Sequence, residues 1–300
     1  MFTDMTRMFL SRLFLLFSLA AAGQSGYPVA LDARLVKLAD GFAFTEGPAA
    51  DHQGNIYFTD QPNDRILKWS AGGELSVFME GAGRANGLYF GRDGYLYSCS
   101  DMENEIWRIA PDGTSEVLTA DFGGKKLNGP NDLWVAPDGS IYFTDPLYKR
   151  DYWTRSPEMQ QDGEHVYRLS ADYKTVVRVA DDLAKPNGII GTPDGKQLYV
   201  ADIGAGKTYR YDIAPNGSLS GKTLFADMGS DGIALDSAGN LYVTGRGVAV
   251  FNPTGERIAH IPVPESWTAN LCFGGPDMKT LFITASNSLY GIRMDVAGMK

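Results

Sequence analysis

The chain has 300 residues, of which 44% are hydrophobic and 21% are charged, and its formal net charge is −9 at pH 7. This composition is typical of a folded protein with a sizeable core and excludes a disordered or collagen-like chain. The negative charge would repel a phosphate backbone, so we expect no nucleic acid partner. Two cysteines cannot build a disulfide framework, and three histidines far apart in the sequence disfavour a zinc site of thiolates or histidines.

The first predicted element is a secretory signal peptide over residues 1–22. Arg7 and Arg12 lie before or beside an apolar run from Leu13 to Ala22, which ends in small residues. A run of about 10 residues is too short to span a bilayer, which takes about 20. We therefore expect a periplasmic or secreted protein without a permanent membrane anchor after cleavage, and one domain over residues 23–300. A permanent anchor or a buried N-terminal helix is the alternative.

The rest of the chain repeats one phrase six times: a turn with Asp or Gly, followed by a short strand that carries an aromatic residue. Each phrase is followed by a second strand and usually a third, as in 65–69 and 74–78, 105–109 and 115–119, and 165–169 and 175–179. Turns with Gly between them favour antiparallel hairpins. The phrases are DHQGNIYFTD (51–60), GRDGYLYSCSD (91–101), APDGSIYFTD (136–145), TPDGKQLYVAD (192–202), DSAGNLYVTG (236–245) and GPDMKTLFITA (275–285).

These units predict an all-β fold, a six-bladed β-propeller with four-stranded antiparallel blades. Their period of about 40 to 50 residues is the one expected for propeller blades. The sixth unit lacks an outer strand after 288–294, and the segment 33–39 before the first repeat offers one. Pairing of these two segments would close the ring and remove two exposed strand edges.

One insertion interrupts the repeats, over residues 146–163. It is rich in aromatic and charged residues, so we expect it either to roof one end of the central channel or to form an ordinary surface loop. Tyr148, Tyr152 and Trp153 are candidate stacking surfaces for a sugar ring.

A polar residue stands 11 or 12 positions before the aligned aromatic residue of every repeat. Equivalent positions at the start of six inner strands surround the same point of a propeller, so these side chains should converge on one mouth of the channel. An alternative is that Asn-Gly and Asp-Gly pairs simply form the turns that enter the strands. The six residues are Glu46, Asn86, Asn131, Asn187, Asp231 and Asn270.

Such a polar cluster predicts a bound cation, because buried carboxylates repel one another and lose hydration. Carboxylate and amide oxygens are hard ligands that suit Ca²⁺, with Mg²⁺, Mn²⁺ or Zn²⁺ as alternatives. Four aspartates also recur three or, for Asp101, four residues after the aligned aromatic, and we expect them to cap turns or accept backbone N–H bonds. These are Asp60, Asp101, Asp145 and Asp202.

At these positions the chain resembles the SMP-30/gluconolactonase family over about residues 35–294. The resemblance implies a six-bladed calcium-dependent propeller, with paraoxonase and diisopropyl-fluorophosphatase as distant relatives. Gly129 departs from the animal regucalcin-type branch, which has Arg there, and places the chain closer to the bacterial gluconolactonase-like branch. The motifs that carry the resemblance are EGP (46–48), LNGPNDLWVAPDGSIYFTDP (127–146), KPNGII (185–190) and SDGIALDSAGNLYVT (230–244).

The family resemblance implies that Glu46, Asn131, Asn187 and Asp231 hold the metal, which leaves Asn86 and Asn270 as substrate-binding candidates together with Tyr148 and Trp153. The expected reaction is hydrolysis of a sugar lactone, in which the metal polarises the carbonyl and a carboxylate accepts the proton of water. Asp231 is the first candidate for this catalytic base and Glu46 the second.

Two alternatives to the lactonase hypothesis stay open, because a fold alone does not decide function. One is a phosphotriesterase or arylesterase at the same metal, and the other is a non-catalytic binding propeller. The expected partner is a small lactone, and we expect a monomer or a weak dimer.

Overall fold

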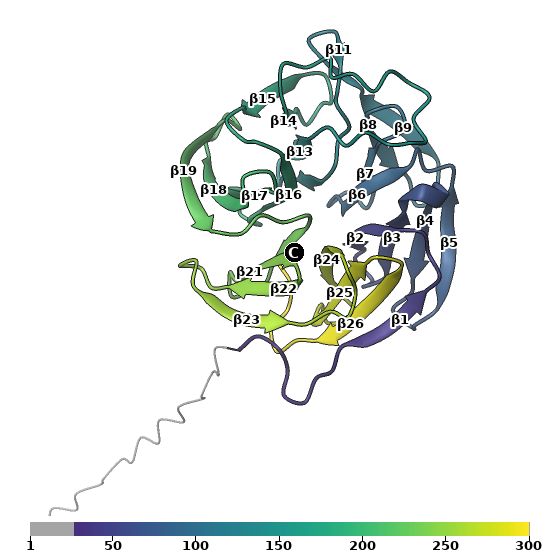
Figure 1. Ribbon diagram of the computed structural model, residues 1–300, viewed down its shortest axis with the longest axis vertical. Coiled ribbons are helices and arrows are strands. Elements are labelled where there is room, and N and C mark those ends of the chain that lie inside the picture. Colours follow the sequence, from purple (N-terminus) through teal and green to yellow (C-terminus); the bar gives the residue numbers. More distant parts are fainter. Residues whose placement is uncertain (1–26, 300) are drawn as a thin grey trace, which may run out of the picture.

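The computed structural model describes residues 27–299, so the predicted signal peptide lies outside the described residues. Within this part of the chain, no helix is long and apolar enough to cross a membrane. The strands form six four-stranded antiparallel sheets that surround a common axis (Figure 1). The predicted six-bladed β-propeller is therefore confirmed.

Each blade begins at the central axis and runs outward through consecutive strands. The first blade is β2 (Thr45–Ala50), β3 (Ile56–Asp60), β4 (Arg65–Trp69) and β5 (Leu75–Glu80), with a 3₁₀ turn, η1 (Gln61–Asn63), between β3 and β4. The second is β6 (Ala85–Phe90), β7 (Leu96–Ser100), β8 (Glu105–Ile109) and β9 (Ser115–Thr119). The third is β12 (Leu133–Val135), β13 (Ile141–Asp145), β14 (His165–Leu169) and β15 (Val176–Ala180), and the small hairpin β10 (Asp121–Phe122) and β11 (Lys125–Lys126) precedes it.

The remaining blades follow the same order. The fourth is β16 (Pro186–Gly191), β17 (Gln197–Asp202), β18 (Lys207–Ile213) and β19 (Leu219–Ala226). The fifth is β20 (Ile233–Leu235), β21 (Leu241–Gly245), β22 (Gly247–Phe251) and β23 (Arg257–Ile261). The sixth is β24 (Thr268–Gly274), β25 (Thr280–Ala285) and β26 (Ser288–Arg293), completed by β1 (Val36–Asp40).

The ring is closed by β1, which pairs antiparallel with β26 from Val36 opposite Gly291 to Asp40 opposite Ser288. The predicted pairing of the two ends is confirmed, although β1 begins three residues later than the segment 33–39. Because β1 supplies the outer strand of the last blade, the first and last parts of the propeller fold are tied together, and the edge of β26 is covered.

The core lies between neighbouring blades, where the aromatic residue of each repeat packs against the next blade. Tyr57 meets Phe90 edge to face at 5.0 Å between ring centroids, and Tyr242 meets Phe273 in the same way at 5.1 Å. All six aligned aromatics are buried, which explains why a large apolar side chain recurs at this position of every repeat. They are Tyr57, Tyr97, Tyr142, Tyr199, Tyr242 and Phe282.

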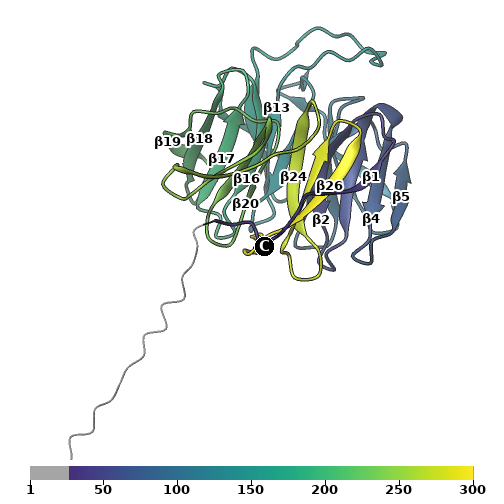
Figure 2. The ribbon, with the colours of Figure 1, turned by 60° about the horizontal axis from the view of Figure 1, so that its bottom comes forward.

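The two ends of the ring differ. Figure 2 shows a long teal loop, which includes the insertion 146–163, projecting from one end, whereas the C-terminal segment lies at the other end. The inner strands all begin at the end that carries the insertion, because each runs from a polar residue of the candidate site towards the Asp/Gly turn of its repeat. We call these the upper and lower mouths of the channel.

Candidate active site

The polar residues at the upper mouth lie at irregular starts of the inner strands. The pairing of β2 with β3 slips between Glu46 and Ala49, and similar slips occur after Ala85 in β6, Pro186 in β16 and Thr268 in β24. Such bulges redirect side chains and are frequent beside active sites. The alternative that these residues form turns does not hold for Glu46, Asn86, Asn187 and Asn270, which lie inside strands, whereas Asn131 and Asp231 lie just before theirs.

Small residues let the strand starts approach one another closely. A Cβ atom at Gly47 would lie 2.1 Å from the carbonyl oxygen of Asn86, and one at Gly232 would lie 2.1 Å from Oδ1 of Asn270. A Cβ at Gly188 would lie 2.9 Å from the carbonyl oxygen of Asp231. The glycine after a site residue therefore makes room for the site residue of the next blade.

Asp231 is the centre of the cluster. Its Oδ1 accepts a hydrogen bond from Nδ2 of Asn187 at 2.7 Å, and its Oδ2 accepts one from the indole Nε1 of Trp267 at 2.7 Å. The carboxyl group of Glu46 lies beside that of Asp231, close enough for the two to affect each other's pKa. Three residues from three blades, far apart in the sequence, therefore lie close together at the upper mouth.

Asn131, the fourth predicted ligand, is buried and joins the cluster through the main chain. Its backbone N–H donates to the carbonyl of Thr144 at 2.9 Å, and the Thr144 hydroxyl donates to the carbonyl of Asn187 at 2.8 Å. The carbonyl of Asn131 accepts the N–H of Gly87 at 2.8 Å. Thr144 thus fixes the main chains of Asn131 and Asn187 relative to each other.

The two carboxylates of the cluster strongly affect each other. Burial raises the pKa of Glu46 well above its ordinary value, and the nearby charge of Asp231 raises it further. Burial also raises the pKa of Asp231, while the N–H groups of Trp267 and Asn187 act in the opposite direction. Without a cation, the pair is most stable when a proton lies on Glu46 and the charge on Asp231.

Asp132 and Asn270 form a polar layer just below this cluster. Asp132 accepts the backbone N–H of Leu133 at 2.9 Å and further hydrogen bonds from Ile189 and Asn270. Burial raises the pKa of Asp132 to about 7. Asn270 therefore acts as a partner of Asp132, whereas Asn86 is buried and its carbonyl accepts a bond from the hydroxyl of Thr59 at 3.1 Å.

Three of the four recurring aspartates accept backbone N–H groups just before a site residue, as predicted. Asp60 binds Ala43 and Phe44 ahead of Glu46, Asp145 binds Asn128 and Gly129 ahead of Asn131, and Asp202 binds Ala184 and Lys185 ahead of Asn187. These carboxylates hold the chain where it enters the site.

The prediction for Asp101 is wrong, because its carboxylate binds the insertion. Its Oδ2 accepts the hydroxyl of Tyr152 at 2.6 Å and the indole N–H of Trp153 at 3.2 Å, and Arg150 lies 3.5 Å away. Asp101 thereby ties the insertion 146–163 to the second blade, beside the upper mouth.

The insertion reaches the cluster through Tyr148, whose hydroxyl accepts a hydrogen bond from Nδ2 of Asn187 at 3.1 Å. Trp153 lies further out, stacked with the Arg155 guanidinium at 3.3 Å, and both flank Gly129. Of the two predicted substrate-binding aromatics, Tyr148 therefore contacts the cluster directly and Trp153 lines its rim. The insertion covers one side of the upper mouth.

The donor set fits a hard cation. Oδ1 of Asn187 is buried without a hydrogen-bond partner, and the two carboxylates beside it would be relieved of their mutual repulsion by a positive charge. Over residues 27–299, no three His, Cys, Asp or Glu side chains converge as a metal site. A metal at the upper mouth would therefore need amide oxygens in addition to Glu46 and Asp231.

Comparison with known proteins places this arrangement in a family. Residues 44–287 match the model of the SMP-30/Gluconolactonase/LRE-like region. The chain belongs to the SMP-30/gluconolactonase family. The expected resemblance to this family is confirmed over residues 44–287.

Members of the family with similar sequences are named for lactone hydrolysis. A gluconolactonase of Zymomonas mobilis is 29% identical over 291 residues, which is 87% of this chain and 81% of that protein. A lactonase of Staphylococcus saprophyticus is 29% identical and covers 73% of this chain and 69% of its own length. The solved structure of a gluconolactonase from Xanthomonas campestris has a TM-score of 0.82 and 31% identity, covering 89% of this chain and 95% of that one.

Trp267 is the residue of the site that the sequence patterns missed. It lies three residues before Asn270, where the other repeats have Ala43, Gly83, Asn128, Ala184 and Met228. A large aromatic side chain at a position of smaller or flexible ones was the available signal. The residue is 47% exposed, while its indole N–H donates to Asp231.

Proposed function

We propose that this protein is a metal-dependent lactonase that opens a sugar lactone to the corresponding sugar acid. The observation that carries the proposal is the close approach of Glu46, Asn187 and Asp231, from three different blades, at the upper mouth. The lactonases and gluconolactonases among its relatives support the reaction class. The fold alone would not support a reaction class, since propellers serve many functions.

The proposed metal ligands are Glu46, Asn131, Asn187 and Asp231, and the proposed metal is Ca²⁺. The free Oδ1 of Asn187 and the repulsion between the two carboxylates support this assignment. A divalent cation bound there would polarise the lactone carbonyl and stabilise the negative charge that develops on its oxygen.

Asp231 is the proposed base. Its two oxygens are each held by an N–H group, from Asn187 and from Trp267, so the carboxylate is fixed in orientation before substrate arrives. It accepts a proton from the attacking water as the water oxygen bonds to the carbonyl carbon. The ring C–O bond then breaks, and the ring oxygen takes up a proton to become the hydroxyl of the sugar acid. Glu46 is the second candidate for this role.

Aromatic side chains at the rim are the proposed contacts of the sugar ring. Trp267 exposes its ring beside the base, Tyr148 contacts Asn187, and Trp153 is stacked with Arg155 on the insertion. Aromatic faces suit the C–H surfaces of a sugar, and the hydroxyls and guanidinium groups between them suit its polar edge. We further propose that the protein is exported after removal of residues 1–22 and acts as a monomer or a weak dimer.

Hydrolysis of a panel of slowly opening sugar lactones tests the proposal. The purified protein should hydrolyse at least one of them, lose that activity in a chelator and regain it with Ca²⁺. Asp231→Ala should be inactive, whereas the exposed Asp227→Ala should retain activity. Rates equal to the uncatalysed reaction for every lactone would contradict the proposal. Hydrolysis of phosphotriesters or aryl esters in place of lactones would favour the esterase alternative, and inactivity towards all three would favour a binding propeller.

A further inference from the structure

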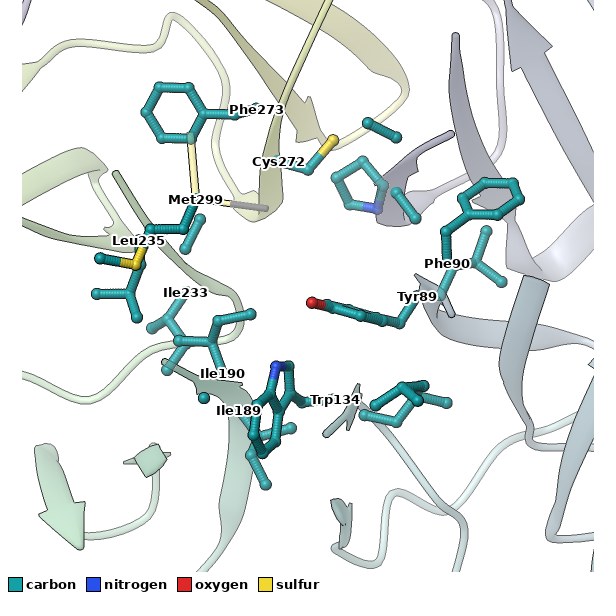
Figure 3. Close-up of a pocket in the computed structure, with 18 of the residues that line it drawn as sticks. Tyr89, Phe90, Trp134, Ile189, Ile190, Ile233, Leu235, Cys272, Phe273 and Met299 are labelled. Carbon is teal, nitrogen blue, oxygen red and sulfur yellow. The ribbon is translucent and has the colours of Figure 1, made fainter. Parts of the chain in front are cut away.

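The lower half of the channel contains a cavity of about 190 Å³ that the proposed reaction does not use. It is lined by the inner strands of all six blades, and most of its walls are apolar (Figure 3). We call it the channel cavity. Its walls include Ala49, Tyr89, Trp134, Ile190, Ala234 and Cys272, one from each blade.

The channel cavity is separate from the candidate metal site. Asp132 and Asn270 form its upper wall, while the four proposed metal ligands do not line it. Asp132 already accepts the backbone N–H of Leu133 at 2.9 Å, and Oδ1 of Asn270 accepts that of Leu271 at 2.8 Å, so both side chains of this polar layer are engaged with the protein. A molecule in the cavity would not touch the cation.

Apolar side chains in the cavity walls remain accessible to solvent, although they lie at the centre of the ring. Tyr89, Phe90, Val135, Ile190 and Cys272 are all only partly buried. Side chains are close-packed between neighbouring blades, but protein atoms do not fill the central axis. The apolar surface that faces the axis is therefore available to a ligand. An apolar occupant would remove it from water, which is favourable.

The hydroxyl of Tyr89 points into the middle of this space (Figure 3), whereas the charged or ionisable lining residues Asp51, His52 and Arg92 belong to the turns at the lower mouth. Trp134 lines the cavity beside Tyr89, and the hydroxyl of Tyr89 can donate its proton to one acceptor on a ligand. Although both side chains keep some surface towards the cavity, the surrounding protein displaces water and raises the pKa of Tyr89 and that of Cys272, which disfavours a charge on either group. A sugar would leave most of its hydroxyl groups unpaired here.

The lower mouth is crossed by the segment Asp295–Met299. The N–H of Gly298 donates to the carbonyl of Met278 at 2.9 Å, and the N–H of Met299 donates to that of Leu235 at 3.1 Å. Met299 itself lines the cavity, next to Leu235 and Phe273 in Figure 3. The entrance is therefore framed by a flexible thioether side chain, which adapts readily to apolar ligands.

We propose that the channel cavity binds a neutral, monocyclic molecule that carries one hydrogen-bonding oxygen. The size follows from its volume, since a dry apolar cavity of about 150 Å³ accepts benzene. The oxygen accepts the proton of the Tyr89 hydroxyl, and the ring packs against Ile190, Ala234 and Cys272. This site is independent of the lactone chemistry at the upper mouth.

Binding of 4-fluorophenol to the full-length mature protein, followed by ¹⁹F NMR, tests this proposal. We expect a saturable shift of the fluorine signal that persists in Asp231→Asn and in the presence of chelator. Excess cyclohexanol should displace the probe, whereas myo-inositol, with a hydroxyl on every ring carbon, should not. Failure of the wild-type protein to bind, or displacement by myo-inositol, would overturn the proposal whatever the lactonase assay shows.

Two variants locate the bound probe. Ala234→Leu fills the cavity and should abolish binding, whereas the matched control Ala71→Leu, in an exposed turn of the first blade, should bind like the wild type. If Ala234→Leu does not fold, Tyr89→Phe decides, because loss of one hydrogen bond should weaken binding roughly threefold to tenfold. If Ala234→Leu folds and binds the probe as well as the wild type, the proposal is overturned. If Ala234→Leu does not fold, undiminished binding by Tyr89→Phe overturns it.

Discussion

The indole Nε1 of Trp267 lies 2.7 Å from Oδ2 of Asp231, and Trp267 as a residue is 47% exposed. One side chain therefore both orients the proposed base and presents an aromatic face to the upper mouth. Because Asn187 binds the other oxygen of Asp231, neither oxygen can turn without losing a hydrogen bond. The sixth blade thus contributes to a site whose proposed ligands come from other blades.

Replacing Trp267 by Phe should weaken metal binding. The ring is retained but its N–H is lost, and removal of such a supporting hydrogen bond typically costs 10- to 100-fold in metal affinity. We expect a decrease of about tenfold in Ca²⁺ affinity, measured by calorimetric titration. Trp69→Phe, in the first blade, is the matched control and should bind Ca²⁺ as the wild type does. Equal affinity in both variants would contradict a positioning role for Trp267.

Asp231→Asn should separate activity from stability. We expect lactone hydrolysis to fall by at least 100-fold, because the proposed base and a ligand charge are lost. In chelator, the stability of the variant should stay within about 1 kcal/mol of the wild type, because relief of the repulsion between two buried carboxylates offsets the loss of one of the two N–H bonds that Asp231 accepts. Urea unfolding in chelator, with Asp227→Asn as control, measures this. A variant that is inactive and clearly less stable would indicate a structural role for the carboxylate.

The repeat pattern in the sequence was sufficient to predict the fold and the closure by β1. Spacing alone placed Glu46, Asn187 and Asp231 at one mouth, because a propeller turns equal repeat positions into neighbours. Trp267 differs from the residues at the same position of the other repeats, so equal spacing did not point to it, and the role of Asp101 depends on the insertion, which the repeats do not encode. The sequence could not distinguish bulges at the strand starts from turns, because Asn-Gly and Asp-Gly pairs are compatible with bulges as well as with turns.

Gly232 should tolerate no side chain, because a Cβ there would lie 2.1 Å from Oδ1 of Asn270. Gly232→Ala should lower the free energy of unfolding by about 1 to 3 kcal/mol, as overpacking usually does. Gly72→Ala is the matched control, since a Cβ at Gly72 meets only Oγ of Ser70, at 3.6 Å. Its stability should change by less than about 0.5 kcal/mol. Equal effects of the two substitutions would show that the strand starts are less closely packed than the structure indicates.

Asp145 should make the stability of the protein depend on pH. Burial raises its pKa to about 7, although it accepts the N–H groups of Asn128 and Gly129. Because the pKa of the folded state exceeds that of an unfolded Asp, about 3.9, the folded state binds more protons between these values. The contribution of Asp145 to stability is therefore fully present below about pH 4 and decreases as pH rises towards 7, by at most about 4 kcal/mol.

Asp145→Asn should remove this dependence. The amide accepts one backbone N–H but cannot accept the second, so the variant should be less stable than the wild type at pH 4. It should then lose less stability than the wild type between pH 4 and 7, because position 145 no longer titrates. Urea unfolding of the variant and the wild type at several pH values measures how the free energy of unfolding of each depends on pH. If stability depended on pH equally in the variant and the wild type, the pKa of Asp145 would be the same in the folded and the unfolded chain. Burial would then not raise the pKa of this carboxyl group.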